Sequence, residues 1–510
     1  MKKILGIELG STRIKSVLIS ESATVLATGS YEWENKIVNG FWSYSLDEVK
    51  TGLQQSYADL LKNYGEPIKN IDVIGLSGMM HGYLAFDKNG NQLAEFRTWR
   101  NTHAGEASKE LCEKLNFKIP QRWSIAQFYQ AVLDKEEHIK DVAFLTTLSG
   151  YVHWLLTGRK VLGVCDASGM FPINDGNYDK AMLNTFNEML KAHSIEQKAE
   201  DLLPQVLYAG QNAGVLTENG AKLLDISGTL QAGSMFCPPE GDAGTGMVAT
   251  NSVKVKRGNV SAGTSAFVML TVENPPKKIY NEIDVAMTPS GSPFVMSQAN
   301  NCTNEINAWT NLFAEVVELS GGKISKGELF TRLFNVSKES DAQTGKLFAC
   351  NFLSGEATAG VKQGRPLFLK MPDGNMSLAN FMQAQIYSAL ATLRLGMDVL
   401  KDENIKVESI CGHGGFFKTE FIGQNAMSAV LDAPVTVMKN AGEGGAYGIA
   451  LLALFMALGN GTLEDFLDKI FEKCEKTTVM ASAEEKAKFE DFMTRYKKGL
   501  LVEKCAEKEL

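Results

Sequence analysis

The chain has 510 residues, 44% of them hydrophobic, and a formal net charge of -8. That length is too great for one hydrophobic core and predicts two domains of about 200 to 250 residues each. The acidic balance, without a long run of Lys or Arg, argues against a nucleic-acid surface and makes a small molecule the expected ligand.

The cysteines and apolar segments suggest where the protein works. Its eight cysteines lack the paired spacing of zinc sites or disulfide frameworks, which favours buried, reduced thiols. The first predicted strand starts at once, without a charged leader and apolar signal core. The longest apolar stretch, Ile449–Leu458, is about half the length needed to cross a bilayer. These features predict a soluble cytoplasmic protein with no membrane partner.

The first motif is a hairpin over Ile4–Ile19, where two apolar strands flank a turn and Glu8 stands just before that turn. The turn consists of Gly10, Ser11 and Thr12. Its backbone N–H groups and hydroxyls can bind phosphate oxygens, and Lys15 adds a positive charge nearby. Glu8 is a candidate for organising a metal ion. For this segment alone, a plain hairpin with glycine at its turn is the more common reading.

A helix is expected next, with Ser45 as its N-cap, Glu48 closing a capping box and Gly65 ending it. A short buried strand at Ile71–Leu76 then leads into the loop S-G-M-M-H-G, and another strand follows near Tyr83–Phe86. This mixture of hairpins, helices and buried strands predicts an α/β fold.

Two polar or aromatic features of this region are candidate sugar contacts. Met80 and His81 lie on the loop, where a histidine can hydrogen-bond a polyol, although a lone histidine is more often a packed or surface residue. Trp99 could stack on the apolar face of a sugar, and a half-buried structural tryptophan is the alternative.

Asp242 lies in the glycine-rich segment E-G-D-A-G-T-G, read as a loop. A carboxylate there can accept the proton of a substrate hydroxyl as that oxygen attacks phosphorus, whereas an isolated Asp-Gly loop is more often a simple turn. The predicted domain boundary follows, with domains over residues 1–248 and 249–510.

A second hairpin over Asn259–Val272 repeats the first, and two copies half a chain apart suggest duplicated halves that close on one nucleotide. Its turn consists of Gly263, Thr264 and Ser265. A long helix at Leu378–Leu400, a strand at Lys406–Cys411, a glycine-rich G-H-G-G-F-F segment and a helix to Leu431 are expected next. Glycines at strand ends let ligands approach the backbone. The charged tail, Ser482–Leu510, predicts a surface helix with a frayed end.

Taken together and in order, these motifs resemble the FGGY family of carbohydrate kinases, in its xylulokinase-like branch, within the superfamily that includes actin and the heat-shock chaperone ATPases. The matching segments read GIELGSTRIK, GLSGMMHG, W-x-N at 99–101, CDASGMF, EGDAGTG, SAGTSA, GHGGFF and GEGGAYGIALLA. The resemblance implies two ribonuclease-H-like domains with ATP and a sugar in a cleft between them, and a homodimer is a family-based expectation.

The resemblance also implies roles for individual residues. Asp242 would be the catalytic base, and Met80, His81 and Trp99 would bind the sugar. The two hairpin turns and Lys15 would hold the phosphates of ATP. The nucleoside would lie against Gly414, Gly415 and Phe416. Mg²⁺ would bridge the β- and γ-phosphates near Glu8 and Asp242.

The chain departs from the family pattern at three places. Glu8 stands where the family has Asp, and His413 and Phe417 stand where many relatives have glycine and a small residue. In the W-x-N-x-H stretch, Asn101 and His103 stand where the family usually has Asp and Arg. The predicted function is an ATP-dependent kinase of a small sugar, such as the ketose xylulose. A sugar-binding sensor that has lost phosphoryl transfer is the alternative, and an actin-like or chaperone-like ATPase is a third reading.

Overall fold

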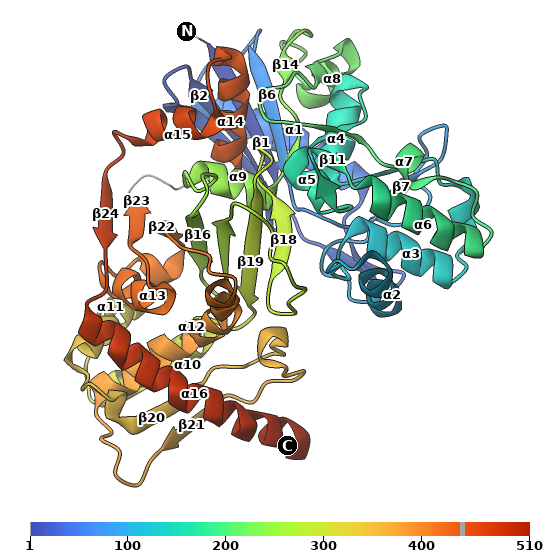
Figure 1. Cartoon of the computed structure of the whole chain (residues 1–510). Helices are drawn as coiled ribbons and strands as arrows, with labels where there is room; N and C mark the ends of the chain where they lie inside the picture. The colour runs from blue at the N-terminus through green and yellow to red at the C-terminus, as the bar shows by residue number, and fades with distance from the viewer. Residues whose placement is uncertain (1, 439–443) are drawn as a thin grey trace. The chain divides into compact units, whose positions relative to one another are not determined.

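The computed structural model describes residues 2–438 and 444–510, so Gly442 and Glu443 of the GEGGAYG motif lie outside the described residues. Contacts divide the chain into two compact units (Figure 1). Unit 1 comprises residues 1–253, 285–294 and 441–473, and unit 2 comprises residues 254–284, 295–440 and 474–510. The units are therefore not simple sequence halves, and the division into family domains at residues 248 and 249 stays a prediction.

Unit 1 is built on a seven-stranded sheet with the order β13-β14-β6-β1-β2-β3, in which β15 also pairs with β6. Its strands are β1 (Lys3–Leu9), β2 (Arg13–Ser20), β3 (Val25–Glu32), β6 (Val73–Gly78), β13 (Gly214–Val215), β14 (Met235–Phe236) and β15 (Glu240–Gly241). The first predicted hairpin is confirmed, because β1 and β2 pair antiparallel. Strands β1 and β15 both run parallel to β6, so these three strands end at the same edge of the sheet.

Helices and short strands complete unit 1. The helices are α1 (Leu46–Tyr64), α2 (Gly105–Leu115), α3 (Ser124–Leu133), α4 (Leu148–Thr157), α5 (Val164–Ser168), α6 (Lys180–Ala192), α7 (Ala199–Leu202), α8 (Glu218–Leu224), α9 (Asp242–Ala249), α14 (Gly444–Leu458) and α15 (Leu463–Phe471). The short strands are β4 (Lys36–Val38), β5 (Phe41–Ser43), β7 (Leu84–Phe86), β8 (Phe144–Thr146), β9 (Val161–Gly163), β10 (Ile173–Asn174), β11 (Asn177–Tyr178) and β12 (Gln205–Leu207). The α1 prediction is confirmed, because Ser45 accepts a hydrogen bond from the Glu48 N–H and Gly65 ends the helix.

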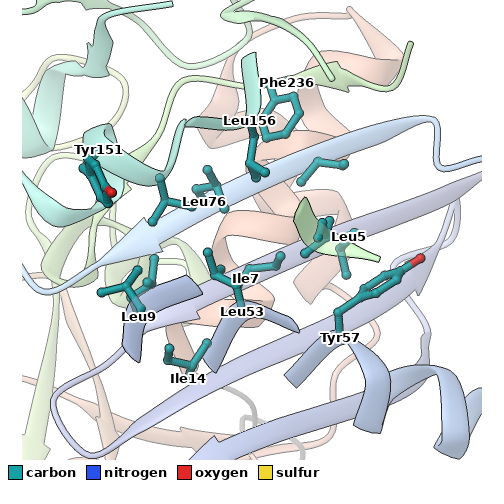
Figure 2. Packing of buried hydrophobic residues seen from close by; sticks show 14 of the residues in the cluster. Leu5, Ile7, Leu9, Ile14, Leu53, Tyr57, Leu76, Tyr151, Leu156 and Phe236 are labelled. Atoms are coloured by element: carbon teal, nitrogen blue, oxygen red, sulfur yellow. The ribbon is translucent and has the colours of Figure 1, made fainter. Parts of the chain in front are cut away.

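The core of unit 1 includes every second side chain of strand β1, because alternate residues of a strand face the same side of the sheet. Leu5, Ile7 and Leu9 share one face of the sheet and are fully buried, and Figure 2 shows them among side chains of neighbouring elements. Those neighbours include Ile14, Leu53, Tyr57, Leu76, Tyr151, Leu156 and Phe236.

Helix α14 contacts β1 and β6, and it approaches β1 very closely. A Cβ atom at Gly6 would lie 2.2 Å from the Ala446 carbonyl oxygen, closer than real Cβ contacts, so glycine is required there. Within the described residues, no single helix is long and apolar enough to cross a membrane. The consecutive helices α14 and α15 reach that composition only as a pair, and they bend by 115°.

The second sheet has the order β18-β19-β17-β16-β22-β23-β24. Its strands are β16 (Arg257–Ala262), β17 (Ala266–Thr271), β18 (Asp284–Met287), β19 (Pro293–Ala299), β22 (Ser409–His413), β23 (Val435–Met438) and β24 (Lys476–Val479). The predicted second hairpin is confirmed by antiparallel β16 and β17, and β22 runs parallel to β16. Unit 2 also contains α10 (Asn304–Leu319), α11 (Lys326–Val336), α12 (Leu378–Asp402), α13 (Ile422–Leu431), α16 (Ala483–Glu509), β20 (Leu347–Cys350) and β21 (Leu367–Lys370).

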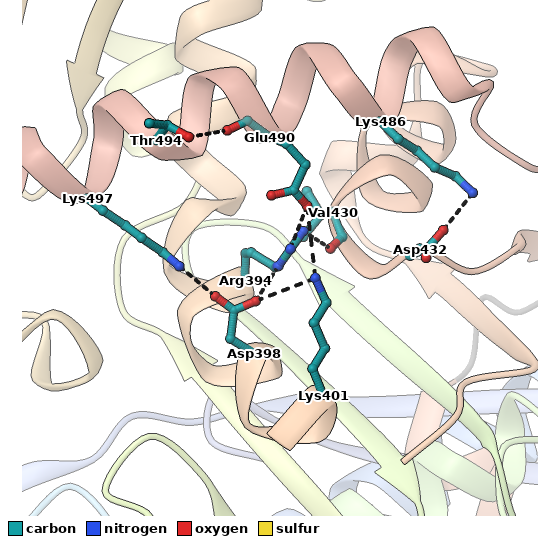
Figure 3. A network of polar contacts seen from close by, with 9 residues as sticks. All are labelled: Arg394, Asp398, Lys401, Val430, Asp432, Lys486, Glu490, Thr494 and Lys497. Carbon is teal, nitrogen blue, oxygen red and sulfur yellow. Dashed lines mark hydrogen bonds and ion pairs between the residues drawn. The ribbon is translucent and has the colours of Figure 1, made fainter. Parts of the chain in front are cut away.

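A network of charges joins three helices of unit 2 (Figure 3). Arg394 of α12 is buried and binds Asp398 at 2.6 Å, Glu490 of α16 at 2.5 Å and the Val430 carbonyl of α13 at 3.2 Å. Because this guanidinium is buried, removing one of its partners should destabilise unit 2 more than removing an exposed ion pair would.

Two sequence expectations need correction. Tail helix α16 is not only a surface helix, because Phe489, Phe492, Met493 and Tyr496 are buried, and it stays helical to Glu509 instead of fraying early. The prediction that the cysteine thiols are buried is confirmed for five of the eight cysteines and is wrong for the other three. Cys112 and Cys474 are partly exposed, and Cys505 is exposed.

Candidate active site

The parallel register of unit 1 gathers three predicted motifs at one sheet edge. Ser77 of β6 is opposite Glu8 of β1 on one side and opposite Glu240 of β15 on the other. Beyond these positions the three strands lead into the first hairpin turn, the Met-Met-His loop and Asp242. The Met79 N–H also donates to the Leu9 carbonyl at 3.0 Å, which fixes the loop to the hairpin. Ligands of parallel sheets bind at such carboxyl ends.

Asp242 is the first residue of helix α9, which corrects the prediction of a glycine-rich loop. Its Oδ1 accepts hydrogen bonds from the N–H groups of Met80, at 3.3 Å, and Ala243, at 3.0 Å. Burial raises the pKa of Asp242 to about 6, although these N–H donors oppose the rise. The carboxylate is therefore ionised near neutral pH yet basic enough to accept a proton.

Glu8 lies against the first turn of α14. Its Oε2 accepts the Ala446 N–H at 3.2 Å, and a Cβ atom at Gly445 would lie 2.5 Å from its Oε1. Burial, and then the charge of Asp242, raise the pKa of Glu8 to about 7, while Lys15 and the Ala446 N–H oppose the rise. Glu8 is longer than the Asp of the family pattern, and the absence of a side chain at Gly445 leaves room for it.

Met80 and His81 pack closely against glycines of two other motifs, and the absence of a side chain at those glycines permits this packing. A Cβ atom at Gly241 would lie 2.2 Å from Met80 Cγ, and one at Gly169 would lie 2.7 Å from His81 Nδ1. His81 has a left-handed φ of 68°, an uncommon conformation for a residue with a side chain and one that recurs at functional sites. Its Nδ1 lies 3.0 Å from the Gly169 carbonyl, which can only accept, so Nδ1 carries a proton.

Two buried carboxylates behind this loop were missed as site residues by the sequence reasoning. Asp166, in the quoted CDASGMF segment, accepts hydrogen bonds from the Thr147 hydroxyl at 2.7 Å and from the Ser149 hydroxyl. Its N–H donates to Glu240 Oε2 at 3.0 Å, so Glu240 connects α5 to the strand that precedes Asp242. Burial raises the pKa of Asp166 to about 7 and the pKa of Glu240 well above its usual range. The sequence signal that could have identified both residues is the combination of acidic and small residues in the CDASGMF and EGDAGTG motifs.

The first hairpin turn is held by aromatic donors. The Trp33 indole N–H donates to the Gly10 carbonyl at 2.7 Å, and the Tyr44 hydroxyl donates to the Ser11 carbonyl. Trp99 is 38% exposed, and its indole N–H donates to Ser11 Oγ at 3.4 Å. Lys15 is partly buried and lies opposite Glu8 across the hairpin, and the Thr12 side chain is exposed.

Asn101 and His103 are the two residues after Trp99 that depart from the family pattern, and their contacts argue against a direct role in sugar binding. The Asn101 side chain is buried, and its amide binds both the N–H and the carbonyl of Trp42 at 2.9 Å. The His103 ring packs edge-on against Phe41, with 4.8 Å between ring centroids. Both side chains therefore support the β4–β5 hairpin.

Unit 2 gathers its predicted nucleotide residues at one edge of its own sheet. The carbonyl of Gly263 accepts hydrogen bonds from the N–H and the hydroxyl of Thr303, and the hydroxyl-bearing side chains of Thr264 and Ser265 are exposed. A Cβ atom at Gly414 would lie 2.4 Å from the Ala262 carbonyl oxygen, so the glycine lets β22 end directly against the hairpin.

Phe416 is fully buried, with its ring edge-on to Phe334 and 5.7 Å from it between centroids. A nucleoside contact by Phe416 stays a prediction, and it would have to use the backbone. Gly415 begins a short 3-10 turn over Gly415–Phe417, next to Gly414.

Comparison with known proteins agrees with this architecture. The fold is the two-domain α/β fold of xylulose and glycerol kinases. Over 100% of both chains it matches the ligand-bound xylulose kinase of Lactobacillus acidophilus, with a TM-score of 0.81 and 16% identity. A glycerol kinase of Plasmodium falciparum with ADP matches with a TM-score of 0.76 and 14% identity, over 100% of this chain and 98% of that chain.

Residues 3–230 match the N-terminal domain, and residues 258–457 the C-terminal domain, of the FGGY family of carbohydrate kinases. The chain belongs to this family and is a sugar phosphotransferase. The xylulose kinase of Haemophilus influenzae is 23% identical over 439 residues, which cover 83% of each chain. ATP is the phosphoryl donor of the family.

The residues at the unit 1 edge are compatible with a magnesium ion. Across residues 2–438 and 444–510, no group of three or more His, Cys, Asp or Glu side chains is arranged to hold a metal. Mg²⁺ bound with a nucleotide uses one or two carboxylates together with phosphate oxygens and water, so Glu8 and Asp242 fit that chemistry.

Proposed function

We propose that this chain transfers the γ-phosphoryl group of ATP to a hydroxyl of a small ketose such as xylulose, with Asp242 as the general base. The observation that carries the proposal is the carboxylate of Asp242. It is fixed by the Met80 N–H beside the His81 loop, and burial gives it a pKa of about 6. A base of that pKa can take a hydroxyl proton as the oxygen attacks phosphorus.

Each predicted site residue has a task in the proposed reaction. Met80, His81 and the exposed ring of Trp99 would bind and orient the sugar, and Asp242 would remove its proton. The turns Gly10–Thr12 and Gly263–Ser265, with Lys15, would bind the phosphates. Gly414, Gly415 and Phe416 would border the nucleoside. Glu8 and Asp242 would hold Mg²⁺, which neutralises charge on the phosphates when bound.

Xylulose is the favoured substrate because several curated relatives are named xylulose kinases and the Met80–His81 pair matches that branch. The departures at Asn101 and His103 bear less on the sugar than the sequence suggested, because both side chains support the β4–β5 hairpin. Glu8 accepts the Ala446 N–H and occupies space that a side chain at residue 445 would fill. This fit of the longer side chain argues for an active enzyme over a sugar sensor. A cytoplasmic location and a homodimer stay predictions.

A panel of pentuloses, hexuloses and polyols in a coupled ADP-release assay tests the proposal. A ketose, with D-xylulose as the first candidate, should give turnover that saturates with sugar concentration. ADP release that no sugar stimulates would contradict the proposed kinase activity. Turnover with polyols alone would contradict the proposed substrate class.

A further inference from the structure

Three aromatic side chains donate hydrogen bonds to the first hairpin turn, but only one of them is exposed. Trp33 and Tyr44 stack on each other with ring centroids 4.2 Å apart, and both are buried. They bind backbone carbonyls of Gly10 and Ser11. Trp99 instead binds the Ser11 hydroxyl, and more than a third of its surface is open to solvent. Trp99 can therefore contact a ligand while it contacts the turn.

The chemistry of this hydrogen bond fixes the role of each partner. An indole N–H can only donate, so Ser11 Oγ must accept. The proton of the Ser11 hydroxyl is not used by that bond and can be donated to another acceptor. A phosphate oxygen is a strong acceptor, and the Gly10–Thr12 turn is the predicted phosphate site.

We propose that Trp99 is a positioning residue that connects the sugar side of the site to the phosphate turn. Its indole N–H holds the Ser11 hydroxyl so that the hydroxyl proton is available to a phosphate of ATP. A sugar stacked on the indole would hold the same ring in place, so the two substrates would support each other through one side chain. This inference rests on the proposed function, which assigns the sugar to Trp99 and phosphate to Ser11.

A double-mutant cycle on nucleotide binding tests the inference without turnover. The protein is titrated with Mg²⁺ and the non-hydrolysable ATP analogue AMP-PNP in a calorimeter, as wild type, Trp99→Phe, Ser11→Ala and the double variant. Phenylalanine keeps a flat aromatic ring for the sugar, and it removes the N–H donor together with the second ring of the indole. Trp42→Phe is the matched control, because that tryptophan lies under the Arg100 guanidinium at 4.4 Å and has no assigned role at the turn.

Loss of one hydrogen bond predicts a dissociation constant ~5-fold higher for Trp99→Phe, a similar rise for Ser11→Ala, and no further rise in the double variant. Trp42→Phe should bind like the wild type. In steady-state assays with D-xylulose, Trp99→Phe should raise KM for ATP more than KM for the sugar.

Unchanged AMP-PNP binding in Trp99→Phe or in Ser11→Ala would overturn the inference. So would effects that multiply in the double variant, because Trp99 would then act independently of Ser11. Either result leaves the proposed function intact. A wild-type protein that does not bind AMP-PNP would overturn both. A melting temperature equal to that of the wild type shows that each variant is folded.

Discussion

The two hairpins predicted to bind phosphate share a backbone plan and differ in the side chains around it. In the first, Glu8 faces Lys15 across the strands, and aromatic side chains bind the carbonyls of the turn. In the second, the position two residues before the turn is Ser261, which faces Phe267, and Thr303 binds the turn. The shared backbone suits phosphate binding, and the charged groups of the first hairpin suit catalysis. Under the proposed function, the repeated structure would therefore provide phosphate binding twice and reactive side chains once.

The largest expected effect tests whether unit 1 supplies the reactive side chains. Asp242→Asn should lower kcat by a factor of about 10² to 10⁴, the usual contribution of a general base, while AMP-PNP still binds. Coupled-assay kinetics and calorimetry measure the two quantities. Turnover near that of the wild type would show that another group accepts the proton.

The pH profile provides a second view of the same residue. Because Asp242 must be ionised to act as a base and its pKa is about 6, kcat/KM should rise with pH and level off above that value. Activity measured between pH 5 and 8 gives the midpoint. A flat profile over this range would contradict the assignment of Asp242 as the base.

Equivalent substitutions in the two hairpins sharpen the comparison. Glu8→Gln removes a charge that the account assigns to the metal and should lower kcat by about 10²-fold, because small misplacements of reacting groups are costly. Ser261→Ala, at the matching position of the second hairpin, should change kcat little. Steady-state kinetics of both variants decide the point, and equal losses would mean that the hairpins share the catalytic work.

Removing a hydrogen-bond donor to the first turn should raise KM for ATP more than removing one to the second turn. Trp33→Phe removes the single indole donor to Gly10 and should raise KM for ATP by ~5-fold. Thr303→Val removes a hydroxyl donor, but the Thr303 N–H still donates to the Gly263 carbonyl at 3.0 Å, so a smaller rise is expected. A larger effect at Thr303 would reverse this order.

The smallest effect concerns stability. Burial raises the pKa of Asp166 from 3.8 to about 7, so between these values the folded state holds a proton that the unfolded state has lost. The free energy of unfolding should therefore fall as pH rises through this window. Asp166→Asn should weaken the dependence of the melting temperature on pH between 5 and 8, measured by calorimetry. An unchanged dependence would show that Asp166 does not hold this proton.

Much of the fold could be predicted because local signals decide it. Alternating apolar residues specified both hairpins, and Ser45 and Gly65 specified the ends of α1. The start of α9 at Asp242 was missed because its glycines favour a loop locally, and tertiary packing decided otherwise.

The parts of the candidate site that depend on long-range packing could not be predicted. The contact between Glu8 and Ala446 joins residues 438 positions apart, and nothing local indicates it. The burial of Phe416 depends on Phe334, and the bond from Trp99 to Ser11 depends on the packing of separate segments.

The most direct test of the central claim follows phosphorus itself. A ³¹P NMR spectrum of the protein with ATP, Mg²⁺ and D-xylulose should show ADP together with a new sugar phosphate ester, and neither signal should grow in Asp242→Asn. ADP formed with inorganic phosphate alone would mean that water, not sugar, receives the phosphoryl group, and would contradict the account.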